Sequence, residues 1–163
     1  MSQTAGQTSQ NAASAAQSAV NVAQDVAGGA RDAASAVDTI FAAPHLRWGV
    51  IGCGVIANQM AEALASVGRT IDGVANRTQE KAVAFAQKHH VKRVYDSIDD
   101  LLASDEIDAV YLTTPHNTHI IYLRKALQAG KHVLCEKSIT LNSAELLEAE
   151  ELARQNGVQL MDA

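Results

Sequence analysis

The stretch that decides the fold is Val50-Ile51-Gly52-Cys53-Gly54-Val55-Ile56-Ala57, in which a short apolar run meets two glycines and then enters a helical pattern. Gly52 permits a tight turn from strand to helix, and Gly54 lets the backbone approach a phosphate group where a Cβ would stand in the way. The N-terminus of the following helix would offer free N–H groups and a partial positive charge to that phosphate. We therefore interpret the stretch as a dinucleotide-binding turn. Contacts are expected from Gly52, Cys53, Gly54, Val55 and Ile56.

The segments that follow this turn alternate between strand patterns and helical patterns. Short runs rich in apolar and β-forming residues predict strands at residues 70–75, 108–113, 132–135 and 158–161. Between them, small and apolar residues recur at every third or fourth position, which is typical of amphipathic helices. Helix caps are expected at Ser97, Asn117 and Ser143 (N-terminal) and at Gly68, Gly130 and Gly157 (C-terminal). The alternation predicts an α/β fold with a doubly wound parallel sheet that helices cover on both faces.

The length of the chain limits its organisation. The chain has 163 residues, and the roughly 120 that alternate allow one domain with a sizeable core but no second substrate-binding domain. We place the boundary of this domain at Ala43-Pro44-His45, because proline ends a helix and restricts the residue before it. The dinucleotide-binding domain is thus expected at residues 44–163. Because the chain stops directly after the last predicted strand, we expect the domain to be truncated before its substrate domain and the chain alone to be weakly active or inactive as an enzyme.

Residues 1–43 have a different composition, rich in alanine, serine and glutamine. Such a low-complexity leader is typical of disorder. On a helical wheel, however, residues 22–41 separate into an alanine-rich apolar face and a polar face, interrupted by Gly28-Gly29. Three interpretations stay open: a mobile or marginal helix, a helix that docks on a partner or a second subunit through residues 12–41, and a lipid contact. The polar face lacks the lysines and arginines that anionic lipid would attract.

Charge and cysteine content bear on the class of function. The net charge is −5, and the chain contains no cluster of Lys and Arg with interleaved aromatic residues that would predict a nucleic-acid surface. No apolar run approaches the length of about 18 residues that a membrane span needs, and no basic-then-apolar leader predicts secretion. Cys53 is expected in the turn after the first strand and Cys135 at the end of a strand two positions away in the sheet, too far for a disulfide. A reducing cytoplasm fits these features, and we assign no metal site.

The residues after the second predicted strand bear on the choice of cofactor. An NAD-preferring site places Asp or Glu about 20 residues beyond the glycine turn, where the acid accepts hydrogen bonds from the adenosine ribose. Here Asn76 and Arg77 hold that place, and no acid occurs from Gly73 through Gln79. An acid would repel a 2′-phosphate, whereas Arg77 can pair with one. The sequence therefore predicts NADP, with NAD as the alternative; the other interpretation is that Arg77 is a solvated residue at the start of a surface helix.

Two further runs follow the later predicted strands: Thr-Thr-Pro-His-Asn-Thr-His at residues 113–119 and Ala-Gly-Lys-His-Val-Leu-Cys-Glu-Lys at residues 129–137. With the glycine turn, they occur in the order and spacing of the Gfo/Idh/MocA family of NAD(P)-dependent oxidoreductases, which residues 46–163 resemble. The chain is most similar to the branch that includes dihydrodiol dehydrogenase-like proteins. The resemblance implies a Rossmann fold that binds NAD(P), with a small-molecule hydroxyl or carbonyl substrate such as a sugar, an inositol or a dihydrodiol.

The resemblance also implies roles for individual residues. Lys137 matches the family's catalytic lysine, which also lies at the cofactor, and Glu136 matches the acid that helps to hold the nicotinamide ribose. Such a lysine could orient a substrate hydroxyl and move its proton while hydride passes to the cofactor. The residues that match the segment lining the cofactor are Thr114, Pro115, Asn117 and His119. Ser138 stands where the family usually has proline, so Lys137 is expected to be less rigidly aimed. The alternatives are a non-catalytic NADPH-binding module and a partner-binding protein that uses the leader.

Overall fold

The computed structural model describes residues 44–163. The chain divides into two units, Met1–His45 and Leu46–Ala163, and the second contains every helix and strand given below. The leader predicted at residues 1–43, with its partner contact through residues 12–41, lies outside the described residues.

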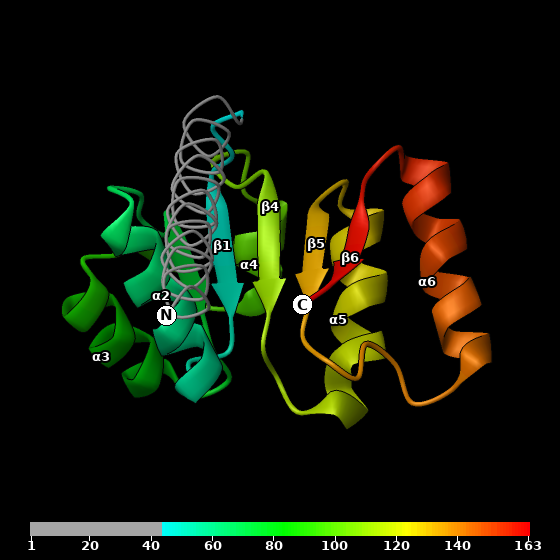
Figure 1. The fold of residues 1–163 in the computed structure, drawn as a ribbon, viewed down its shortest axis with the longest axis horizontal. Helices are drawn as coiled ribbons and strands as arrows, with labels where there is room; N and C mark the ends of the chain where they lie inside the picture. The colour runs from blue at the N-terminus through cyan, green and yellow to red at the C-terminus, as the bar shows by residue number, and fades with distance from the viewer. Residues whose placement is uncertain (1–43) are drawn as a thin grey trace, which may run out of the picture. The chain divides into compact units, whose positions relative to one another are not determined.

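A six-stranded parallel sheet, ordered β3-β2-β1-β4-β5-β6, forms the centre of the second unit (Figure 1). Its strands are β1 (Trp48–Ile51), β2 (Gly73–Ala75), β3 (Arg93–Val94), β4 (Ala109–Leu112), β5 (His132–Cys135) and β6 (Leu160–Asp162). The chain runs outward from β1 to β3 and then returns to place β4 on the other side of β1. Doubly wound sheets open a ligand crevice at such a reversal, outside the carboxyl ends of the strands. The predicted doubly wound parallel sheet is confirmed.

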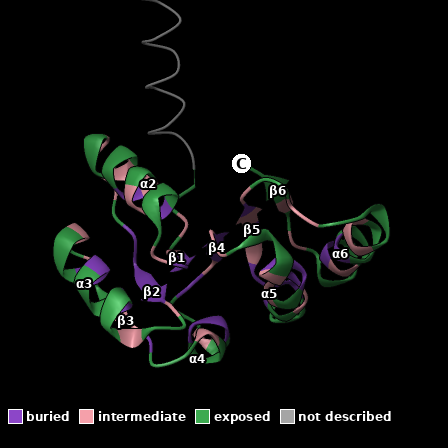
Figure 2. Ribbon diagram, turned by 90° about the horizontal axis from the view of Figure 1, so that it is seen from below, coloured by how far each residue is buried: buried purple, intermediate pink, exposed green. Residues whose placement is uncertain are grey.

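Helices cover both faces of this sheet, as strands buried on both sides require (Figure 2). One face carries α2 (Val55–Ser66) and α3 (Gln79–His89), and the other carries α4 (Ile98–Ala103), α5 (His116–Gln128) and α6 (Ser143–Asn156). Each face has its own apolar core, with Val50 and Phe85 in the first and Leu112 and Leu123 in the second. No helix within residues 44–163 is long and apolar enough to cross a membrane.

The strand boundaries differ from the prediction in instructive places. The strand predicted at residues 132–135 is confirmed as β5. The strand predicted at residues 158–161 begins two residues later, as β6, because α6 ends in a left-handed Gly157 and the Val158 N–H still bonds to the carbonyl of Ala153 at 3.0 Å. The two-residue β3 was not predicted, since so short a strand has no readable alternation.

The structure agrees with some of the predicted helix caps and differs from others. Ser97 is confirmed, since its side chain accepts a hydrogen bond from a backbone N–H of the first turn of α4. The N-caps predicted at Asn117 and Ser143 are wrong. α5 begins directly after Pro115, and α6 begins after Asn142, whose side chain does the capping. The predicted C-terminal glycines Gly68, Gly130 and Gly157 all have positive φ.

Charged groups hold the edge of the sheet at the amino ends of the strands. Asp108 Oδ2 accepts from the backbone N–H and Nε of Arg47, both at 2.9 Å, which joins the start of β1 to the start of β4. The guanidinium of Arg47 lowers the pKa of the Asp108 carboxyl to about 2. Lys131 is buried, and its Nζ donates to the carbonyls of Ser104 and Ile107 at 2.8 and 2.9 Å. These contacts lie opposite the edge that opens the ligand crevice.

Candidate functional site

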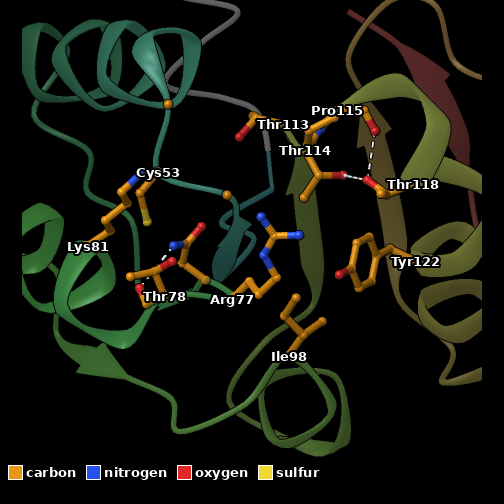
Figure 3. A pocket seen from close by; sticks show the side chains of 13 residues that line it. Cys53, Arg77, Thr78, Lys81, Ile98, Thr113, Thr114, Pro115, Thr118 and Tyr122 are labelled. Carbon is orange, nitrogen blue, oxygen red and sulfur yellow. Dashed lines mark hydrogen bonds between the residues drawn. The ribbon is translucent and has the colours of Figure 1, made fainter.

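A cleft of about 450 Å³ opens where the carboxyl ends of β1, β2 and β4 meet (Figure 3). This is the position at which doubly wound sheets bind ligands. The lining comes from the glycine turn, the segment between β2 and α3, the start of α4, and the wall that runs from β4 into α5. The lining residues are Gly52, Cys53, Gly54, Asn76, Arg77, Thr78, Lys81, Ile98, Thr113, Thr114, Pro115, Thr118 and Tyr122.

Each glycine of the turn meets a different requirement. Gly52 has a φ of +102°, and a Cβ there would lie 2.7 Å from Thr113 Oγ1. Gly54, the N-cap residue of α2, has an ordinary φ of −80°, but a Cβ there would meet no atom within 4 Å. Gly52 is therefore needed by the fold. Gly54 faces open space, where a side chain would fill ligand volume rather than displace the core.

The first turn of α2 has the features of an anion-binding site. No side chain caps this helix, and its first turn contains no acidic residue. Val55 and Ile56 are exposed, and their backbone N–H groups precede the first intrahelical bond, which joins Asn58 N to Gly54 O at 3.2 Å. The helix dipole adds partial positive charge at this end. The geometry matches what a pyrophosphate needs.

Cys53 contributes a neutral surface to the cleft. Its side chain is half-buried beside Lys81 of α3 (Figure 3). Burial raises the pKa of the Cys53 thiol to about 11, because loss of water outweighs the opposing charge of Lys81. The thiol is thus protonated at neutral pH and is no nucleophile. Within residues 44–163, no group of three His, Cys, Asp or Glu side chains could hold a metal ion.

The segment after β2 brings positive charge into the cleft. Asn76 Nδ2 donates to the carbonyl of Thr78 at 2.9 Å, which folds the segment toward α3. The Arg77 side chain extends into the cleft toward the wall that carries Tyr122 (Figure 3). Arg77 and Lys81 are cationic, and none of the residues that line the cleft is acidic. This charge favours a ligand with several phosphate groups.

Lys81 was not among the predicted site residues. It lies in the first turn of α3, two residues after the helix begins, and its approach to the cleft follows from the fold. The other lining residues outside the predicted set are Thr78, Ile98, Thr113, Thr118 and Tyr122. Thr113 and Thr118 belong to the run quoted at residues 113–119, whereas Ile98 and Tyr122 come from α4 and α5, which only the fold brings to the cleft.

The opposite wall contains two of the four residues that the family resemblance assigned to it. Thr114 and Pro115 line the cleft, and the hydroxyl of Thr118 lies 2.9 Å from Thr114 Oγ1 and 2.7 Å from the Pro115 carbonyl (Figure 3). Asn117 is exposed in the first turn of α5 but does not line the cleft. Its contact with a cofactor stays a prediction.

His119 is buried behind this wall instead of facing the cleft. Its Nε2 lies 2.7 Å from the carbonyl oxygen of Thr114, and its Nδ1 lies 3.0 Å from that of Ser138. Carbonyl oxygens only accept hydrogen bonds, so the ring is the donor in each bond that forms. A neutral ring has one N–H and donates to one of these two carbonyls, and the Cys135 sulfur lies 3.4 Å from Nδ1. A direct contact between His119 and a cofactor stays a prediction.

Glu136 and Lys137 follow β5, outside the lining of the cleft. The backbone N–H of Glu136 donates to the carbonyl of Leu112 at 3.0 Å, and its side chain accepts a hydrogen bond from the hydroxyl of Tyr111. Lys137 is exposed, and its peptide bond to Ser138 is cis. No hydrogen bond or ion pair within residues 44–163 holds the Lys137 ammonium.

Comparison with known proteins agrees with the motifs. The Gfo/Idh/MocA family model, described as an oxidoreductase family with an NAD-binding Rossmann fold, matches residues 46–163. Trans-1,2-dihydrobenzene-1,2-diol dehydrogenase of Mus musculus is 37% identical over 121 residues, which cover 72% of this chain and 36% of the relative. The enzyme of the same name from Homo sapiens is 35% identical over 121 residues, with the same coverage.

Solved structures give the same picture. KijD10, a 3-ketoreductase from Actinomadura kijaniata in complex with NADP, superposes with a TM-score of 0.68 at 34% identity, covering 73% of this chain and 38% of that chain. UDP-N-acetylglucosamine 3-dehydrogenase GnnA from Acidithiobacillus ferrooxidans superposes with a TM-score of 0.66 at 34% identity, covering 74% of this chain and 38% of that chain. The chain thus spans a little over one third of the length of these relatives.

Proposed function

We propose, from the premise that this chain belongs to the Gfo/Idh/MocA family of oxidoreductases, that it binds NADP for hydride transfer to or from a hydroxyl or carbonyl substrate. The observation that carries the proposal is the cationic cleft, in which Arg77 and Lys81 are the charged groups and no lining residue is acidic. The names of the relatives, a diol dehydrogenase and two enzymes that act at a 3-keto or 3-hydroxyl position, support a sugar, polyol or dihydrodiol as the substrate class.

The residues of the cleft fit a phosphorylated dinucleotide. The open space at Gly54 and the uncapped first turn of α2 suit the pyrophosphate. Arg77 and Lys81 suit the 2′-phosphate, because a charge-assisted pair with phosphate is roughly twice as strong as a neutral hydrogen bond. Asn76, which stands where an NAD-preferring site has an acid, can reach the adenosine ribose without repelling that phosphate.

We assign the proton transfer to Lys137, and we assign the contact with the nicotinamide ribose to the adjacent Glu136. When bound, NADP accepts or donates the hydride. Lys137 Nζ orients the substrate oxygen: as the ammonium it donates a proton to a carbonyl that is reduced, and as the neutral amine it takes the proton from a hydroxyl that is oxidised. No partner within residues 44–163 engages this nitrogen. Thr114 and Pro115 line the cleft after β4, the strand that pairs with β5, and Glu136 and Lys137 follow β5.

Titration of the chain with NADPH and NADH at matched salt tests the cofactor assignment. We expect NADPH to bind at least about tenfold more tightly, which corresponds to roughly 1.4 kcal/mol from contacts to one additional phosphate. Equal affinities would remove the NADP assignment. Turnover of sugars, polyols and dihydrodiols, measured for a version of the chain extended by a substrate domain and for its Lys137→Ala variant, tests the lysine; an active variant would exclude the role given to it.

We also place the protein in the cytoplasm and assign residues 12–41 to contact with a second subunit or a partner helix. The two cysteines, Cys53 and Cys135, are free, and a reducing compartment keeps such thiols unpaired. The mass of the full chain in solution, measured by light scattering with and without residues 1–43, tests the contact. A monomer in both cases would exclude self-association through the leader.

A further inference from the structure

Tyr111 carries a buried hydroxyl that the cofactor site, as assigned above, does not use. The residue lies in β4, is only 4% exposed, and donates its O–H to Glu136 Oε1. Burial, reinforced by the hydrogen bond and the negative charge of Glu136, raises the pKa of the Tyr111 phenol far above its ordinary range. The phenol therefore stays protonated, and it is a permanent donor to the carboxylate.

The register of the sheet explains why these two groups meet. Tyr111 in β4 is paired with Leu134 in β5. Alternate residues of a strand point to the same face, so Glu136, two residues after Leu134, continues the face that Tyr111 occupies, one step nearer the carboxyl edge. The tyrosine ring belongs to the apolar core that includes Val50 and Leu134. The tyrosine ring is therefore fixed by packing in the core, and its hydroxyl lies at the carboxyl edge of the sheet, where the cofactor site opens.

We propose that Tyr111 is a positioning residue that holds Glu136 ready for the nicotinamide ribose. The inference rests on the proposed function, because the proposed function supplies the nicotinamide ribose that Glu136 would bind. Without a donor, a glutamate at the end of a strand samples several rotamers, and ordering it would cost conformational entropy when the ligand binds. With Oε1 held by Tyr111, the side chain is ordered in advance and Oε2 can accept a ribose hydroxyl.

The test compares two ligands that share one end. NADPH carries both ends of the dinucleotide, whereas 2′,5′-ADP carries the adenosine and the 2′-phosphate but no nicotinamide ribose. Tyr111→Phe removes a single oxygen from a packed ring, so we expect the fold to be kept. By calorimetric titration, this variant should bind NADPH about three- to tenfold more weakly and 2′,5′-ADP as tightly as the parent chain, since Arg77 is untouched.

Further variants make the comparison specific. Tyr95→Phe is the matched control, because Tyr95 is also 4% exposed and donates its hydroxyl to another side chain, Ser104 Oγ at 2.8 Å, away from the cleft. It should leave the ratio of the two affinities unchanged. Glu136→Gln should weaken NADPH selectively. Glu136→Ala removes the group that Tyr111 holds, so adding Tyr111→Phe to it should cost nothing more.

Each outcome decides between the inference and the function on which it rests. If Glu136→Gln changes the affinity ratio and Tyr111→Phe does not, the positioning role is overturned while the proposed function stands. Equal weakening of both ligands by Tyr111→Phe also overturns it, since that pattern reports a loss of structure. If Glu136→Gln leaves the ratio unchanged, the role of Glu136 fails and the inference fails with it. If the parent chain binds neither ligand, the proposed function itself is overturned.

Discussion

Replacing Arg77 with alanine removes the positive charge that projects into the cleft. Arg77 is exposed, so its loss should change the free energy of unfolding by less than about 0.5 kcal/mol. A charge-assisted contact with phosphate contributes about 1 to 3 kcal/mol. Because Lys81 remains in the cleft, we expect the lower part of that range, a loss of about 1 to 2 kcal/mol for NADPH, or roughly 5- to 30-fold in Kd. NADH, which has no 2′-phosphate, should lose little.

Calorimetric titration with both cofactors at one ionic strength measures this difference. Arg93→Ala is the control, because it removes the same charge from β3, where Arg93 pairs with Glu106 at 2.6 Å and does not line the cleft. The effect of Arg77→Ala should also shrink at high salt, which screens an exposed pair. If Arg77→Ala weakens NADPH and NADH equally, or if Arg93→Ala weakens NADPH as much as Arg77→Ala does, the contact between Arg77 and the 2′-phosphate is refuted. Such a result would show only that the overall charge of the chain affects binding.

Three other substitutions test separate parts of the fold. Gly54→Val should abolish nucleotide binding and leave the circular dichroism spectrum intact, because the new side chain enters open space; unchanged affinity would show that the turn is only structural. Asp108→Asn should lower the free energy of unfolding by about 1 kcal/mol at pH 7, a value reduced for the partial exposure of its pair with Arg47. Because the pKa of Asp108 is lowered in the folded chain to about 2, urea titrations should show the difference shrinking as the pH falls from about 4 toward 2; a difference independent of pH would contradict the ion pair. Lys131→Met should cost about 1 to 3 kcal/mol in the same measurement, because two carbonyls lose their donor; an equally stable variant would show that these carbonyls find water.

The glycine turn could be predicted from the sequence because its requirements are local. Gly52 needs a backbone conformation that glycine adopts freely, and Gly54 needs space for a ligand; both follow from a few neighbouring residues. β3 could not be predicted, since two residues paired at the edge of a sheet leave no periodic trace. The cap of α6 was placed one residue late, at Ser143 instead of Asn142, because both side chains are good caps and only the backbone decides between them.

Residues that act across the fold were harder to identify. Arg77 was predicted because it replaces an acid at a known distance from the glycine turn. The contact of Tyr111 with Glu136 depends on the pairing of β4 with β5, and no sequence pattern gives that register. His119 was assigned to the cofactor by resemblance, whereas in the structure its buried ring lies between the carbonyl groups of Thr114 and Ser138, behind the cleft wall. A histidine motif in a sequence does not separate a ligand contact from a structural hydrogen bond.

The order of the motifs along the chain differs from their order across the sheet. Their order across the sheet determines in which orientation a dinucleotide would bind. Along the sequence, the glycine turn comes first, then Arg77, and Lys137 last. Across the sheet, the strand order places Arg77 after β2, the glycine turn after β1 in the middle, and Lys137 after β5. At about 4.8 Å per strand, Arg77 and Lys137 follow strands roughly 14 Å apart. In the proposed binding mode, a dinucleotide with its pyrophosphate at the central turn would have its 2′-phosphate on one side and its nicotinamide ring on the other, which is the orientation that the proposed chemistry needs.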